Sequence, residues 1–164
     1  KTMNKIELYT FYSQNNNNKG LDDNYYRIVY NIPELFDQNV YIKRYPQIQC
    51  DKNNIGIILA GVFNSGILAK GIGDNVTYNY DKIPNHIREK YIIVSEVCDR
   101  YNVPVPAAAL QFSYANKLIS SMILGMDRIE QIQQNISFFN YSIPDDLWKE
   151  LIEKKIIDER CPTP

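Results

Sequence analysis

Hydrophobic and polar residues follow a regular pattern only from about residue 54 onward. The run IGIILAGV, Ile55 to Val62, is apolar throughout and contains glycines, which is typical of a strand buried on both faces in a parallel sheet. Ile119 to Leu124 predicts a second short buried strand, which stops at Gly125. Between them, FNSGILAKGIGDN is too long for a simple turn, and long connections after parallel strands are often functional.

Four helices are predicted in the same part of the chain. Apolar residues from Ile83 to Tyr101 recur at helical spacing, so Pro84 to Tyr101 is predicted to be an amphipathic helix with Pro84 in its first turn. The other three helices are predicted at residues 106–114, 129–139 and 144–154. The order strand, helix, helix, strand, helix predicts an α/β architecture with parallel strands.

Residues 1–54 show no comparable pattern. Strands at 6–12 and 25–30 and a helix at 33–45 are the best assignments, but Pro33 and Pro46 interrupt the periodicity. We therefore expect two parts, a poorly defined N-terminal segment at 1–54, with a degenerate strand–helix unit as one option, and a regular domain at 55–164.

Composition narrows the class of protein. The length of 164 residues suits one domain, and a net charge of −1 argues against nucleic-acid or acidic-membrane partners. The three cysteines are widely spaced and form no CxxC pair, so we expect neither a metal site nor a disulfide framework. No apolar run approaches the roughly 20 residues that span a bilayer, and the first residues lack the features of a signal peptide. A cytoplasmic location is the expectation.

Three single residues have structural predictions. The one histidine, His86, is expected at a solvated position of its helix. Cys98 is expected to pack in the interior on the apolar face of the same helix. Trp148 is expected to anchor the last helix in the core.

The start of the helix at 129–139 carries candidate chemistry. Asp127 and Glu130 form a D-x-x-E arrangement, in which each side chain bonds the other residue's N–H, a cap worth roughly 1 kcal/mol. The alternative is a ligand site, because free N–H groups at a helix start favour anions and Gly125 permits close approach. Gln131 and Asn135 lie four residues apart on one helix face, where they could bind the edge of a flat heterocycle.

Three segments resemble the aldo-keto reductase family. They are LAGVFNSGILAKG at 59–71, AAALQFSYANKLISSMILGMDRIEQIQQN at 107–135 and the ending SIPDDLWKELIEKKIIDERCPTP. The similarity extends over 55–164 and is greatest to the D-threo-aldose (L-fucose) and L-galactose 1-dehydrogenase branch. It implies the C-terminal part of a (β/α)8 TIM-type barrel, incomplete here, with parallel strands and flanking helices.

The resemblance also implies a cofactor, NAD or NADP, bound across the ends of the last two barrel strands. The loop after the first strand would cover the nicotinamide and pyrophosphate with Gly61, Phe63, Asn64 and Ser65. The loop and helix after the second strand would hold the adenosine with Gly125, Met126, Asp127, Arg128, Gln131 and Asn135.

One departure from the family favours NAD over NADP. Relatives that prefer NADP place a Lys or Arg beside the 2′-phosphate, where this chain has Gly125 and Asp127. A carboxylate near a phosphate costs roughly 1 kcal/mol or more, whereas it can accept hydrogen bonds from a ribose diol. Arg128 could still reach a phosphate, so the preference is modest.

The family's catalytic Asp, Tyr, Lys and His come from the first half of its barrel and are not visible here, so no catalytic residue is assigned. A complete barrel needs about 250 residues. The chain could therefore be an incomplete form of an aldose dehydrogenase, inactive alone. It could instead become active by pairing with an N-terminal half or with itself, or be a non-catalytic nucleotide-binding or interaction protein. If catalysis occurs, the resemblance implies hydride exchange between the nicotinamide and C1 of an aldose, giving a lactone.

Overall fold

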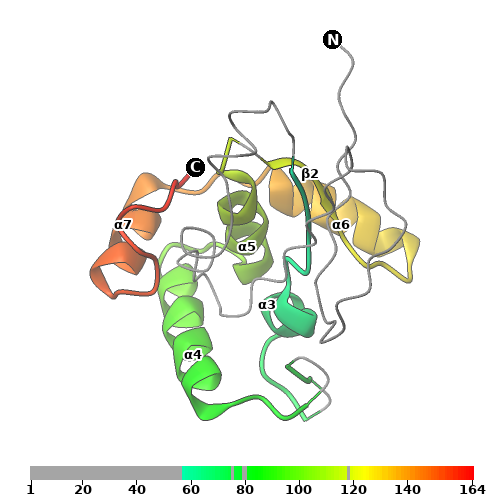
Figure 1. The fold of residues 1–164 in the computed structure, drawn as a ribbon, viewed down its shortest axis with the longest axis horizontal. Coiled ribbons are helices and arrows are strands. Elements are labelled where there is room, and N and C mark those ends of the chain that lie inside the picture. Colours follow the sequence, from blue (N-terminus) through cyan, green and yellow to red (C-terminus); the bar gives the residue numbers. More distant parts are fainter. Residues whose placement is uncertain (1–56, 75, 79–80, 118) are drawn as a thin grey trace, which may run out of the picture.

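The computed structural model describes residues 57–164 except 75, 79, 80 and 118, and the strands and helix predicted within 1–54 lie outside this range. The described part contains two strands, β1 (Ile57–Ala60) and β2 (Ile119–Ile123), which pair in parallel. The predicted parallel α/β arrangement is therefore confirmed for these residues (Figure 1).

All four predicted helices are present, with bounds close to those expected. They are α4 (Asn85–Arg100), α5 (Val105–Tyr114), α6 (Ile129–Phe139) and α7 (Asp145–Glu153). Two short elements after β1 were not predicted, a 3-10 turn η1 (Asn64–Gly66) and a four-residue helix α3 (Ile67–Lys70). Both elements lie within the glycine-rich connection, and each is too short to show helical periodicity in the sequence.

The register of the two strands decides which loops become neighbours. Ile57 lies opposite Ile119 and Ala60 lies opposite Ile123, with one irregularity after Ile57. Because the strands run in the same direction, their carboxyl ends meet at one edge of the sheet. The chain reaches β2 from β1 through α3, α4 and α5, as a parallel connection requires a long crossover.

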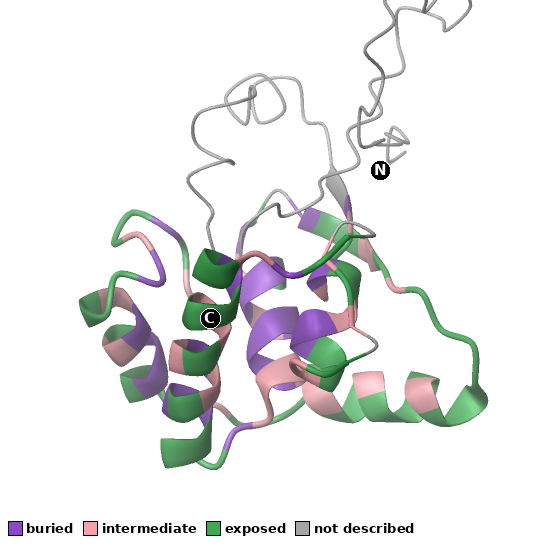
Figure 2. Ribbon diagram, turned by 90° about the horizontal axis from the view of Figure 1, so that it is seen from below, coloured by how far each residue is buried: buried purple, intermediate pink, exposed green. Residues whose placement is uncertain are grey.

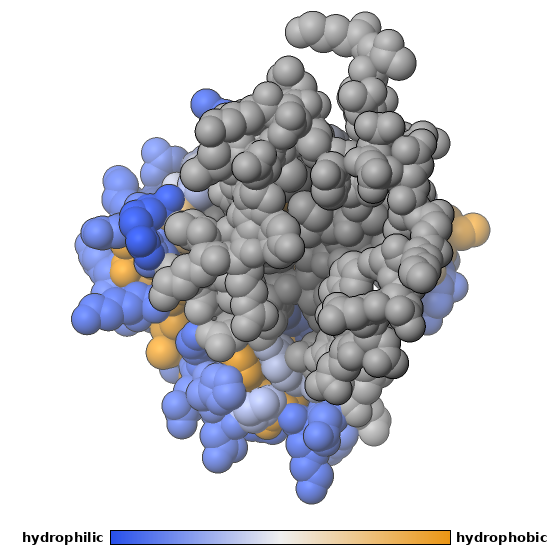
Figure 3. Space-filling view, in the orientation of Figure 1, coloured by the Kyte–Doolittle hydropathy of each residue, from blue (hydrophilic) through white to orange (hydrophobic). Residues whose placement is uncertain are grey.

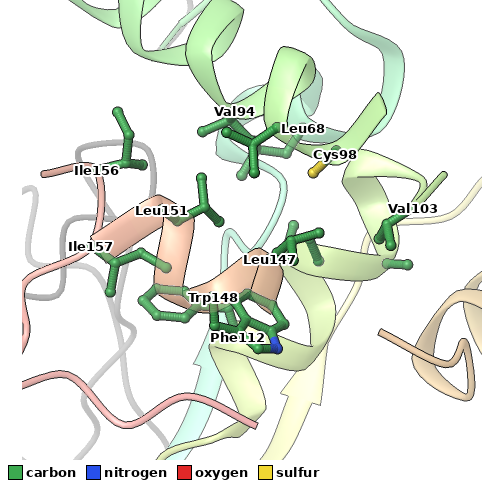
Figure 4. Close-up of a cluster of buried hydrophobic side chains, with 14 of the residues drawn as sticks. Leu68, Val94, Cys98, Val103, Phe112, Leu147, Trp148, Leu151, Ile156 and Ile157 are labelled. Carbon is green, nitrogen blue, oxygen red and sulfur yellow. The ribbon is translucent and has the colours of Figure 1, made fainter. Parts of the chain in front are cut away.

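The core lies between α4, α5 and α7, where Figure 4 shows the buried side chains meeting. The rings of Phe112 on α5 and Trp148 on α7 stack with their centres 6.1 Å apart. Leu147 and Leu151 are fully buried, and so is Cys98 on α4. The core roles predicted for Trp148 and Cys98 are confirmed, and His86 is exposed on α4 as expected. In Figure 2 the helix at the centre, α5, carries most of its residues in the colour of buried positions.

The prediction that the second strand is buried was wrong. Ile119 is buried, but Ser120 and Ser121 are exposed, and the side chain of Ile123 is 60% exposed. An apolar sequence makes a buried strand only where other elements cover it. The described elements cover β2 at its start and leave the rest of the strand open.

Among residues 57–164 as described, none of the helices is long and apolar enough to cross a membrane. Within the same part of the chain, no three His, Cys, Asp or Glu side chains are grouped so that they could hold a metal ion.

Cys98 should react slowly with alkylating reagents in the folded protein. Burial, with a smaller contribution from Asp99, raises the pKa of its thiol from about 9 to about 12. Only the thiolate is nucleophilic, so a shift of this size lowers the reactive fraction at pH 8 by roughly 1,000-fold. We expect peptide mapping after iodoacetamide treatment to show Cys98 protected in buffer and labelled in urea. Equal labelling rates in the two conditions would contradict the burial of this side chain.

Candidate functional site

Two loops leave the same edge of the sheet, and together they form the candidate site. The first follows β1 and begins at Gly61, and the second follows β2 and contains Gly125. Since Ala60 pairs with Ile123, the two loops begin side by side. Ligands of parallel α/β proteins bind at this edge, outside the carboxyl ends of the strands.

The first loop turns sharply through a series of left-handed backbone conformations. The φ angles are +75° at Gly61, +47° at Asn64, +58° at Ser65 and +96° at Gly66. Such angles suit glycine and are tolerated by asparagine, whereas for Ser65 they cost on the order of 1 kcal/mol. The turn is closed by hydrogen bonds, with the Asn64 N–H donating to the Gly61 carbonyl at 2.9 Å. The backbone here is held in a strained and well-defined shape.

The carbonyl of Phe63 accepts two hydrogen bonds at the start of α3. The donors are the N–H of Gly66 at 2.9 Å and the N–H of Leu68 at 3.1 Å. Phe63 itself is half-buried against the core. The loop therefore has one side anchored in the interior, while Gly61 and Ser65 are exposed at its surface.

Asn64 is the most unusual side chain of the first loop. It is only 3% exposed, and among the described residues its Nδ2 has no hydrogen-bond acceptor. A buried donor that lacks a partner costs about 1–3 kcal/mol, so each such group calls for an explanation. The amide nitrogen of Asn64 is therefore a buried donor that the described residues leave without an acceptor.

The second loop is open to solvent. Gly125, Met126, Asp127 and Arg128 are all exposed, and a Cβ added at Gly125 would meet nothing within 4 Å. Gly125 is thus not needed here to avoid a clash, although its surface is accessible to a ligand.

Asp127 and Arg128 form an ion pair at the surface. The Arg128 Nε lies 3.6 Å from the Asp127 Oδ1, and both side chains are more than two-thirds exposed. Exposed pairs of this kind contribute little to stability. The carboxylate and the guanidinium can therefore turn toward a ligand at small cost.

The predicted cap between Asp127 and Glu130 was wrong. The helix α6 begins at Ile129, its N-cap residue is Arg128, and no side chain caps it there. Instead the N–H of Asp127 donates to the Oε1 of Gln131 at 2.9 Å. Because the helix starts two residues after Asp127, its third position is Gln131, and this side chain takes the part expected of Glu130.

Gln131 and Asn135 lie on one face of α6, as predicted, and both are half-buried. Since the carbonyl oxygen of Gln131 holds the turn at Asp127, the amide nitrogen is the group of this side chain that remains for a ligand. Residues 61–65 and 125–128 thus lie at the same edge of the sheet. Gln131 and Asn135 follow the second loop along the chain, on α6.

Two tyrosines outside the loops do not have the properties of a catalytic proton donor. Burial raises the pKa of Tyr91, even though a hydrogen bond with Ser95 acts in the opposite direction. Burial likewise raises the pKa of Tyr101, with a smaller contribution from the nearby Glu150 carboxylate. An acid or base that works near neutral pH needs a lowered tyrosine pKa, so neither residue is a candidate.

Sequence reasoning alone did not single out the left-handed turn, although the letters N-S-G carried a signal for it. Asparagine and glycine are the residues that adopt positive φ most readily. Asn64 was assigned to the site by resemblance, and the burial of its amide nitrogen without an acceptor was not predicted.

Comparison with known proteins agrees with the fold. The sequence model of the Aldo/keto reductase family matches residues 22–156. A pyridoxal 4-dehydrogenase from Microbacterium luteolum is 39% identical over 106 residues, which make up 65% of this chain and 31% of that protein. A D-threo-aldose 1-dehydrogenase from a Pseudomonas species is 36% identical over 116 residues, 70% of this chain and 34% of that protein. The chain therefore spans about a third of the length of these relatives.

Solved structures give the same fold. An aldo-keto reductase from Bacillus halodurans superposes with a TM-score of 0.53 in its apo form and 0.51 in its holo form, at 13% identity. The match covers 80% of this chain and 44% of the apo structure, so the chain corresponds to part of an α/β barrel. From the family match and these relatives together, the chain belongs to the aldo/keto reductase family.

Proposed function

We propose that this chain is the dinucleotide-binding, C-terminal part of an NAD(P)-dependent dehydrogenase that oxidises an aldose. Its own residues bind and orient the cofactor, and the substrate is a sugar or aldehyde held largely by the rest of the barrel. Membership of the family and the aldose and pyridoxal dehydrogenase relatives support this class of reaction. A reducing, cytoplasmic location is part of the proposal, supported by the free thiol of Cys98, which is buried on α4.

The observation that carries the proposal is the buried donor of Asn64 in a strained turn at the sheet edge. The backbone of the turn is closed by hydrogen bonds from the N–H groups of Asn64 and Gly66, which fix the position of the Asn64 Cα. A dinucleotide carries carbonyl, hydroxyl and phosphate oxygens, and each of these is a suitable acceptor. The residues present therefore fit the cofactor that the family uses.

The two loops would have different roles. Gly61, Phe63, Asn64 and Ser65 would hold the nicotinamide and pyrophosphate end, where the exposed backbone of Gly61 permits close approach. The second loop would hold the adenosine, with Asp127 accepting hydrogen bonds from ribose hydroxyls and Asn135 near the base. When bound, the dinucleotide supplies the group that accepts the hydride.

The proposal includes inactivity of the chain by itself. His86 is exposed on α4, away from both loops along the chain, and Tyr91 and Tyr101 have raised pKa values. Neither tyrosine therefore suits the role of a proton donor near neutral pH. Proton transfer would therefore come from the part of the barrel that this chain does not match.

Replacing Asn64 with Leu should weaken NADH binding about tenfold, because the loss of one hydrogen bond to a ligand costs about 1–1.5 kcal/mol. Isothermal titration of the purified chain with NADH measures the effect. Asn102 is a matched control, since it also has a positive φ, +54°, but lies after α4 and outside both loops. Asn102→Leu should leave the affinity unchanged. If the chain bound no NADH, or if the two variants were equal, the proposal would fail.

Asp127 should set a modest preference for NADH over NADPH. Replacing it with Asn removes one negative charge near the expected 2′-position, and the ratio of the two dissociation constants should shift toward NADPH about fivefold at low salt. Glu130→Gln serves as the control, because it removes the neighbouring carboxylate in the first turn of α6. Tighter binding of NADPH than NADH by the unsubstituted chain would refute the repulsion argument.

A further inference from the structure

The helix α3 ends at Gly71, where the backbone comes unusually close to a side chain of α4. Gly71 has φ +83° and ψ −172°, a conformation that residues with a side chain rarely adopt. A Cβ at this position would lie 3.1 Å from the Oη of Tyr91 and 3.8 Å from its Cζ. The phenol of Tyr91 therefore lies directly against the bare backbone of Gly71.

The side chain of Tyr91 is held in place by α4. Ile87, Val94 and Cys98 are fully buried, and Tyr91 lies on the same face of the helix at helical spacing. Tyr91 is half-buried against the core, and its hydroxyl forms a hydrogen bond with Ser95, one turn farther along α4. In Figure 3 the surface at the lower end of α4 is largely hydrophilic, as expected for a helix whose apolar side faces the core. The phenol is thus fixed from the core side, independently of the loop that it contacts.

Backbone hydrogen bonds connect Gly71 to the turn that carries Asn64. The N–H of Gly71 donates to the carbonyl of Ile67 at 2.9 Å, and the N–H of Leu68 donates to the carbonyl of Phe63 at 3.1 Å. Phe63 directly precedes Asn64 in the chain. Because α3 is a single turn of helix, a displacement at Gly71 is passed through these bonds to the start of the turn.

We propose that Tyr91 is a positioning residue for the first loop, because its phenol sets the place of Gly71 and, through α3, the direction of the Asn64 side chain. Tyr91 itself neither touches the cofactor nor transfers a proton. The inference deepens the proposed function, on which it rests for the role of Asn64 in binding the dinucleotide. The competing interpretation is that Tyr91 only fills space at the border of the core, as Tyr101 does at the end of α4.

Amide hydrogen exchange tests the positioning without any ligand. Tyr91→Ala removes the phenol, so exchange in residues 61–71 should become about tenfold faster through local opening, while exchange in α5 and α7 stays unchanged. Tyr101→Ala is the matched control, since it removes another half-buried tyrosine and should leave residues 61–71 protected. Unchanged exchange at 61–71 in Tyr91→Ala, or an equal increase in α5 and α7, would contradict the proposal.

Gly71→Ala tests the close approach itself. Its Cβ would meet the Oη at 3.1 Å in the unsubstituted chain, whereas in a Tyr91→Phe background only the ring carbon at 3.8 Å remains, an ordinary contact distance. The backbone strain is the same in both backgrounds. Gly71→Ala should therefore accelerate exchange at 61–71 about threefold more in the presence of Tyr91 than in the Tyr91→Phe background. Equal acceleration would show that strain alone is responsible and would refute the role of the contact.

Titration with NADH tests whether Tyr91 acts through Asn64. Tyr91→Ala should weaken NADH binding about fivefold, but in an Asn64→Leu background it should cause no further loss, because residues that act through one contact are not additive. Tyr101→Ala should leave the affinity unchanged. Losses that multiply in the double variant would give Tyr91 a separate role and overturn the proposal. If the unsubstituted chain bound no NADH, the proposed function would fail, whereas the exchange measurements would still decide whether Tyr91 positions the loop.

Discussion

The parallel pairing of β1 with β2 is the constraint on which the rest of the structure depends. Parallel strands cannot be joined by a tight turn, so the chain between them forms a crossover that contains α3, α4 and α5. That crossover supplies much of the core, because α4 and α5 bury their apolar faces against α7. The same pairing brings the loops at Gly61 and Gly125 to one edge. Packing and binding geometry thus have a common origin.

Burial is uneven among the elements that the structure describes. Phe112, Trp148 and Leu151 belong to a continuous buried cluster, which gives the α4, α5 and α7 side the packing of a domain interior. In contrast, among the described residues α6 has no buried residue and β2 is buried only at Ile119. Burial is therefore concentrated in the crossover helices and α7.

Sequence reasoning succeeded where the signal is local and failed where it depends on distant neighbours. The spacing of Ile87, Val94 and Cys98 predicts α4 because helical periodicity does not depend on what the helix packs against. The apolar letters of β2 predict a strand, but its burial requires cover from elsewhere in the chain, which the described residues do not provide. The prediction of the cap was wrong by a single position. Glu130 and Gln131 are adjacent, and only the exact start of the helix decides which of them bonds the N–H of Asp127.

The strain at the first loop bears on how a ligand would affect stability. The turn at Asn64 and Ser65 holds unfavourable backbone angles and a buried donor without an acceptor, costs that persist in proteins when the surroundings impose them or a ligand relieves them. A ligand that binds only the folded state stabilises it in proportion to the logarithm of its concentration.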